Sequence, residues 1–180
     1  LPHEIICNVV TKATPDYVCQ RQWRTLEDQI RASNIFSDTL AVVDTSISMK
    51  DWGKPKNDRF PFSPMDVALG MGILISNCST MKNHVINFSN NPVLMKLISN
   101  DIYTRCQELR NSEWAGTLNF NDVFDLILKY NKKYNFIPKK LLVLTDMSFT
   151  SAGGSSTDFE AIDIKFDRLG IKKPLIIFWN

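Results

Sequence analysis

The chain has 180 residues, of which 44% are hydrophobic, and its formal net charge at pH 7 is +2. This length suits one domain with a substantial core and is too short for two domains of ordinary size. Because the net charge is small, overall electrostatics do not favour nucleic acid or a membrane surface as a partner. Binding to either would need a local patch of positive charge. No apolar run reaches the ~20 residues that span a bilayer, and we expect no membrane contact.

The predicted elements alternate between helices and strands. Residues 1–10 have an extended character, and we expect a strand or a docking arm there. Pro15 and Asp16 introduce a predicted helix that ends near Ser33, and the pair Ser63 and Pro64 is typical of a helix start. Apolar runs predict strands at 40–43, 84–89, 92–98, 141–145 and 175–179, and helical spacing predicts helices at 63–75, 101–110, 123–130 and 159–169.

This alternation predicts an α/β fold, Rossmann-like and doubly wound, with a mostly parallel sheet and helices on both faces. The segment that begins at Pro92 suits an antiparallel edge strand, because its proline stands at the start. We divide the chain into residues 1–37, an arm and helix that pack on the domain or join an upstream module, and residues 38–180, the α/β domain. A ligand site is expected at the carboxyl ends of the strands.

Oxygen-bearing side chains follow the predicted strand LAVV. Asp44 ends this strand, and Ser46 and Ser48 follow at intervals of two residues, so one loop can direct three oxygen ligands toward one point. An oxygen-only ligand set with little charge suits a hard cation. The alternative is that these residues cap a helix or close a turn. A second apolar run, LLVLTDM, ends at Asp146, and Thr117 lies between the two runs, before a helix-like stretch.

Together, DTSIS, Thr117 and Asp146 resemble the metal-ion-dependent adhesion site (MIDAS) of a von Willebrand factor A domain. The similarity is closest to the branch akin to the Ro/TROVE ribonucleoproteins, and within it to an uncharacterised family of plants, microbes and large DNA viruses. LPHEI, INFSNNP, WAGTLNFNDVFDLIL and PLIIFWN also resemble that family. The family fold continues with a further helix and strand, so the resemblance implies that the sheet lacks its last strand here or receives it from residues beyond Asn180.

The resemblance implies one divalent cation, Mg²⁺ or else Mn²⁺ or Ca²⁺. Asp44 would anchor it, Ser46, Ser48 and Thr117 would be direct or water-shared ligands, and Asp146 would orient waters or hydroxyls. Magnesium prefers six oxygen ligands, so this set leaves one position open for an acidic side chain of a protein partner. We therefore expect a metal-dependent protein-interaction module in an intracellular setting, the host cytoplasm or virion if the protein is viral.

A basic and aromatic loop follows the DTSIS motif and is the candidate partner-binding surface. Such side chains can hold phosphates and stack bases, although a solvated loop is the alternative. The residues are Lys50, Trp52, Lys54, Lys56 and Arg59.

Two other functions stay open from the sequence. The Ro-like resemblance allows a role in an RNA-binding ribonucleoprotein, in which the module preceding the A domain would make most RNA contacts. A magnesium-dependent phosphotransferase would place a second acid two residues after the attacking aspartate, and position 46 is serine. We therefore expect a protein that is not an enzyme.

Overall fold

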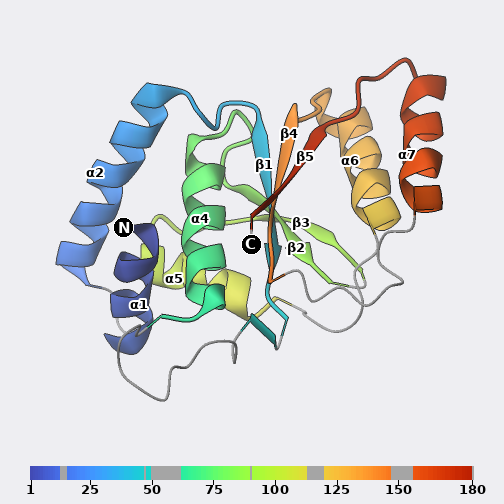
Figure 1. Ribbon diagram of the computed structural model, residues 1–180. Helices are drawn as coiled ribbons and strands as arrows, with labels where there is room; N and C mark the ends of the chain where they lie inside the picture. Colours follow the sequence, from blue (N-terminus) through green and yellow to red (C-terminus); the bar gives the residue numbers. More distant parts are fainter. Residues whose placement is uncertain are drawn as a thin grey trace.

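The structure is a computed structural model that describes residues 1–12, 16–46, 48–49, 62–89, 91–112, 120–146 and 156–179. The described strands form one five-stranded sheet with the order β3-β2-β1-β4-β5 (Figure 1). The strand β1 is therefore central and has β2 and β4 as its neighbours. The strands are β1 (Thr39–Asp44), β2 (His84–Phe88), β3 (Val93–Lys96), β4 (Lys140–Leu144) and β5 (Leu175–Trp179).

The sheet is mostly parallel. Strand β1 runs parallel to both β2 and β4, and β4 runs parallel to β5, whereas β3 pairs with β2 in the antiparallel direction. The prediction of a parallel sheet with one antiparallel edge strand is therefore confirmed. Strand β5 forms the other edge of the described sheet, and the side chains of Leu175, Phe178 and Trp179 are exposed there.

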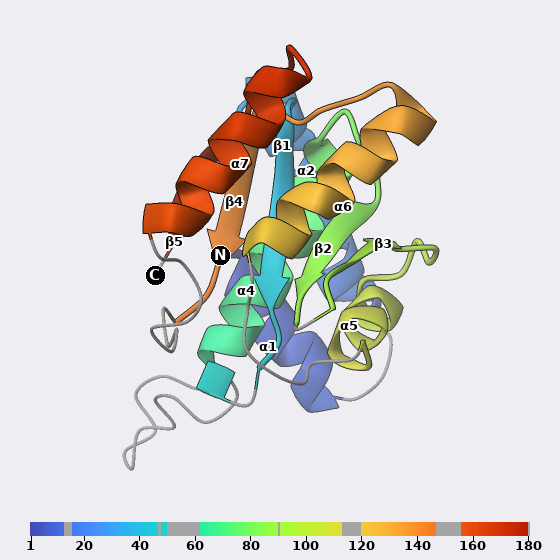
Figure 2. The same cartoon turned by 90° about the vertical axis from the view of Figure 1, so that its right-hand side faces the viewer.

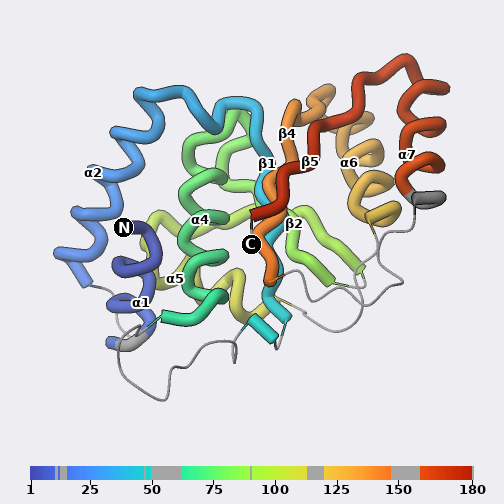
Figure 3. Tube along the Cα trace, viewed as in Figure 1, coloured from blue at the N-terminus to red at the C-terminus, as the bar shows by residue number. Residues whose placement is uncertain are grey.

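Helices cover both faces of the sheet, as expected for a doubly wound fold. Figure 2 shows the face crossed by α6 and α7, and the opposite face carries the other helices. The Cα trace in Figure 3 shows α1 and α2 outside α4, and α1 contacts α2, α4 and α5. The helices are α1 (Pro2–Lys12), α2 (Tyr17–Ser33), α4 (Pro64–Cys78), α5 (Ile102–Arg110), α6 (Phe120–Tyr134) and α7 (Ser156–Arg168).

The central strand separates two hydrophobic cores because successive side chains of a strand point to opposite faces. Ala41 and Val43 pack into the core below α4, together with residues of α1, α2 and α5. Leu40 and Val42 pack into the second core, below α6 and α7. Every residue of β1 is buried, which explains the continuous apolar run at residues 40–43.

The prediction of an extended first segment is wrong, because residues 2–12 form the helix α1. The β-branched pairs of this segment favour a strand locally. Their positions, however, also place Ile5, Ile6 and Val9 on one helical face, and all three are buried against the rest of the domain. Gly70 of α4 allows this contact, since a Cβ atom there would lie 3.1 Å from Cγ1 of Ile6. Tertiary burial therefore overrides the local preference.

Helix α4 begins as the sequence predicts and packs directly on β1. The side chain of Ser63 accepts a hydrogen bond from the Asp66 amide, and Asp66 Oδ2 accepts one of 2.8 Å from the Ser63 amide. At Gly72 the helix comes very close to the sheet, because an added Cβ atom would lie 2.4 Å from Cγ2 of Val43. This approach fixes α4 against the residue that precedes Asp44.

Candidate functional site

Asp44 is the last residue of the central strand, and both oxygen atoms of its side chain accept hydrogen bonds. Oδ1 accepts a hydrogen bond of 2.9 Å from the backbone amide of Ser46. Oδ2 accepts one of 2.7 Å from the hydroxyl of Thr145, the residue that follows β4. Asp44 is only 5% exposed, so these contacts hold a buried negative charge in one orientation.

Two serine hydroxyl groups follow Asp44 in the chain. The Oγ atoms of Ser46 and Ser48 are 2.9 Å apart, within hydrogen-bonding distance. The fold positions them through two anchors, because the Ser46 amide binds Asp44 and the neighbouring Met49 is 2% exposed in the hydrophobic core. The structure therefore joins the Ser46 amide to the Asp44 carboxylate and brings the hydroxyls of Ser46 and Ser48 together.

Asp146 lies at the end of the neighbouring strand. Residues Val43 of β1 and Leu144 of β4 are paired in register, so the segments that follow them leave the same edge of the sheet. Asp146 is half-buried, and its Oδ2 atom is shielded from solvent. Asp146 therefore follows the strand beside β1, on the same side of the sheet as the end of β1.

The remaining predicted site residues lie outside the described residues. Thr117, the expected ligand from the loop before α6, belongs to the segment 113–119. The basic and aromatic loop belongs to the segment 50–61, and it includes Lys50, Trp52, Lys54, Lys56 and Arg59.

The sequence reasoning missed Thr145 as a functional residue. Its position directly before Asp146 made it the last residue of a predicted strand, whereas its side chain contacts Asp44 across the sheet. One sequence feature could have indicated this contact: the two apolar runs that predict neighbouring strands are both followed by polar residues. The carboxyl ends of two neighbouring parallel strands lie side by side. The first polar residue after one strand can therefore contact the first polar residue after the other.

The donor set is made of hydroxyl and carboxylate oxygens. Across the described segments, no group of three or more His, Cys, Asp or Glu side chains is placed to hold a metal ion. A transition-metal site of the zinc type is therefore not formed by those residues. In the same part of the chain, no helix is both long and apolar enough to cross a membrane.

Comparison with known proteins places the chain in a family. The family described as a domain of unknown function, DUF7788, matches residues 38–180. The chain belongs to this family. The matched range contains the whole described sheet as well as Asp44, Ser46, Ser48 and Asp146.

The chain is also similar to an uncharacterized protein of Acanthamoeba polyphaga mimivirus, with 28% identity over 187 residues. The alignment covers 99% of this chain and 31% of the viral protein. The chain therefore spans less than a third of the length of this relative.

Proposed function

We propose that this domain is a metal-dependent protein-interaction module that binds an acidic group of a partner through one divalent cation. The observation that carries the proposal is the polar group that follows β1, in which the Ser46 amide donates to the Asp44 carboxylate and the hydroxyls of Ser46 and Ser48 lie 2.9 Å apart. The resemblance of DTSIS, Thr117 and Asp146 to the MIDAS of von Willebrand factor A domains supports the same function.

The residues present fit a hard cation. Carboxylate and hydroxyl oxygens are the ligands that Mg²⁺ and Mn²⁺ prefer. Each oxygen of Asp44 accepts one hydrogen bond from the described residues named above, and a carboxylate oxygen has lone-pair capacity for a second interaction. In this proposal Asp44, Ser46, Ser48 and Thr117 hold the ion, and Asp146 orients the ligands or the water around them. When bound, the ion supplies positive charge and an open coordination position.

The protein's own contribution is preorganisation. The Thr145 hydroxyl and the Ser46 amide fix the Asp44 carboxylate before any ligand arrives, so little side-chain entropy is lost on binding. Asp44 is the one carboxylate that would bind the ion directly, and the hydroxyl ligands are neutral, so the ion would keep a net positive charge that attracts a further carboxylate. An acidic partner group is therefore the complementary ligand.

A phosphotransferase fits the site less well. Such an enzyme needs a second acid two residues after its attacking aspartate to move a proton. The corresponding residue is Ser46, whose hydroxyl lies against that of Ser48. The proposal for this domain therefore contains recognition and no catalytic step. A role in an RNA-binding assembly stays the alternative.

Isothermal titration of Mg²⁺ and of Mn²⁺ into the purified chain tests the proposal. We expect saturable binding to one site in the natural protein and no measurable binding in the variants Asp44→Ala and Asp44→Asn. Asp44→Asn keeps an oxygen that can accept from the Ser46 amide, so it controls for loss of folding, which circular dichroism would report. Unchanged binding in both folded variants would refute the site, as would the absence of binding in the natural protein.

A further inference from the structure

A polar cleft of about 310 Å³ lies on the α2 side of the molecule, away from the Asp44 site. Its walls come from α2, the end of α4, the turn before β2, and the residues before and within α5. The turn residue Lys82 precedes β2, whereas Asp44 ends the parallel strand β1. The cleft therefore opens toward the amino end of β2, the rim opposite to the one where Asp44 emerges.

Four cationic side chains and one carboxylate line this cleft. The carboxylate, Glu27, accepts hydrogen bonds from the indole of Trp23 and the side-chain amide of Asn77, both uncharged donors. The cations therefore outnumber the acids, and none of them forms an ion pair with Glu27 among the described residues. The four cations are Arg24, Arg31, Lys82 and Arg105.

Arg105 is the most informative of these residues because it is only 6% exposed. Its guanidinium donates to the side-chain oxygens of Asn77 and Asn83, the latter at 3.0 Å, and to the carbonyl of Ser99. All three acceptors are neutral, and no ion pair between Arg105 and a carboxylate is formed by the described residues. Burial lowers the pKa of Arg105, and the charges of Glu27 and Glu108 oppose this shift. Arg105 therefore places a buried positive charge, held by neutral acceptors, in the wall of the cleft, and such a charge attracts an anionic ligand.

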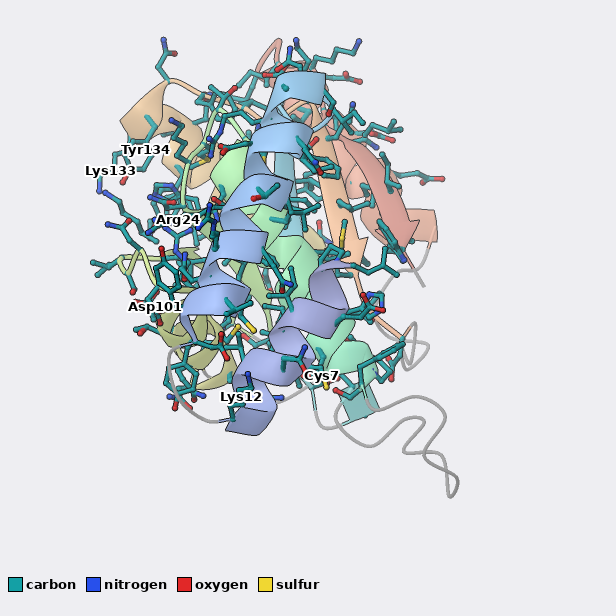
Figure 4. All side chains as sticks on the ribbon, turned by 90° about the vertical axis from the view of Figure 1, so that its left-hand side faces the viewer. Cys7, Lys12, Arg24, Asp101, Lys133 and Tyr134 are labelled. Atoms are coloured by element: carbon teal, nitrogen blue, oxygen red, sulfur yellow. The ribbon has the colours of Figure 1, made fainter. Side chains whose placement is uncertain are left out.

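Arg24 and Lys82 stand at the mouth of the cleft. Both side chains are exposed, and within the described part of the chain neither makes a side-chain hydrogen bond or an ion pair. Figure 4 shows Arg24 projecting from α2 on the side where Asp101, at the start of α5, also lies. Arg31 is less available, because it contacts Asp28 at 3.4 Å and the carbonyl of Asn77 at 3.3 Å.

We propose that this cleft binds a small phosphorylated molecule, whose phosphate group contacts Arg24 and Lys82 and faces the buried Arg105. Guanidinium groups match phosphate oxygens in pairs, and lysine adds a point charge. The volume is in the range of small-molecule sites. Among the described residues no aromatic side chain lines the cleft, whereas sites for single-stranded nucleic acid combine basic residues with rings that stack on bases. The shape and lining therefore favour a compact phosphate ester over a polynucleotide.

Titrations with inorganic phosphate, adenosine monophosphate and a short single-stranded RNA test this proposal, all in the presence of EDTA. The chelator removes divalent cations, so the outcome is independent of the Asp44 site. We expect saturable binding of phosphate and of the monophosphate to one site. In the double variant Arg24→Gln/Lys82→Gln both affinities should fall by about tenfold or more, because two charged contacts are lost.

The matched control is the double variant Arg21→Gln/Lys96→Gln, which removes two exposed cations that do not line the cleft. Its affinity for phosphate should stay within about twofold of the natural value. Equal losses in the two double variants would overturn the proposal, because they would assign binding to general surface charge. The absence of saturable phosphate binding would also overturn it. So would RNA binding that is tighter than that of the monophosphate and falls equally in both variants.

Discussion

The hydroxyl of Thr145 donates a hydrogen bond of 2.7 Å to Oδ2 of Asp44, a residue 101 positions earlier in the chain. The bond joins the ends of the two central parallel strands, and both residues are almost inaccessible to solvent, at 4% and 5% exposure. A hydrogen bond to a buried charge is stronger than one between neutral groups. The contact between Asp44 and Thr145 in the candidate site should therefore also contribute to the stability of the fold.

Replacing Thr145 with valine removes this donor and keeps the shape of the side chain. We expect Thr145→Val to lower the free energy of unfolding by about 1–3 kcal/mol, because a buried carboxylate oxygen loses a hydrogen bond. Urea unfolding followed by circular dichroism measures the difference. The same variant should bind Mg²⁺ less tightly if the orientation of Asp44 matters for the proposed site.

Thr39 offers a matched control for this substitution at the other end of β1. It is 2% exposed, and its Oγ1 atom has no hydrogen-bond partner among the described residues. Thr39→Val should therefore leave the free energy of unfolding nearly unchanged or raise it, since no hydrogen bond is lost and a polar atom leaves the core. Equal losses of stability in the two variants would show that the Thr145 contact has no special weight.

The close approach of α4 to β1 makes a second prediction. In Gly72→Ala the new Cβ atom would lie 2.4 Å from Cγ2 of Val43, so the helix or the strand must move. Overpacking of a core costs about 1–3 kcal/mol, and the gain in helix propensity returns only about 1 kcal/mol. We expect a net loss of stability in urea unfolding.

The double variant Gly72→Ala/Val43→Ala tests the cause of this loss. Val43→Ala alone removes the methyl group that the new Cβ atom would meet. If the clash causes the loss, the double variant will be more stable than the sum of the two single changes predicts, by about 0.5 kcal/mol or more. Simple additivity would contradict the assignment of the loss to this contact.

The order of strands and helices followed from local signals in the sequence. Residues 175–179 and the helix start at Ser63 were predicted correctly, since an apolar run and a cap are local features. Helix α6 is longer at both ends than the predicted 123–130. At its start, Phe120 contacts Phe88 and Phe159, and no local pattern reveals these contacts.

What the sequence could not supply was pairing between distant residues. The helical state of residues 2–12 depends on burial against α4, and the contact of Thr145 with Asp44 depends on the adjacency of β1 and β4. The cleft around Arg105 has the same origin, because its cations lie on α2, on the turn before β2 and on α5. By contrast, Ser46 and Ser48 are near neighbours of Asp44 in the sequence, so a local pattern could predict them as candidates for one site.

The start of α2 makes a prediction about pH. Asp16 accepts hydrogen bonds from Lys12 Nζ and, at 2.9 Å, from the backbone amide of Cys19. The lysine contact first, and the amide second, lower the pKa of Asp16 to about 2. An unfolded aspartate has a pKa of about 3.9. Its contribution to stability is therefore fully present above about pH 4 and is lost as pH falls toward 2.

The variant Asp16→Asn should be less stable than the natural protein at neutral pH, and the difference should shrink as pH falls through this window. Urea unfolding at a series of pH values measures it. Asp28→Asn is the control, because Asp28 lies exposed on the same helix and its ion pair among the described residues is with Arg31. A difference with the same pH dependence in both variants would assign the effect to general charge instead of the helix cap.

Adding a charge at Ser46 tests the proposed open coordination position. The Ser46 hydroxyl contacts the Ser48 hydroxyl, and the Ser46 backbone amide donates to Asp44. A carboxylate at position 46 would therefore join the proposed metal ligands. In Ser46→Asp we expect Mg²⁺ to bind about tenfold more tightly, because affinity for hard cations rises with ligand charge. Acetate, titrated into the Mg²⁺-loaded protein as the simplest carboxylate probe, should bind more weakly, since the ion is already more neutralised.

The neutral variant Ser46→Asn separates charge from size in this experiment. It replaces the hydroxyl with an amide oxygen of similar reach to the aspartate, so it should not tighten Mg²⁺ binding to the same degree. Weaker acetate binding only in Ser46→Asp would support recognition of an acidic group by an under-neutralised ion. Tighter acetate binding in Ser46→Asp would contradict that mechanism, because added negative charge beside the ion cannot attract a second carboxylate.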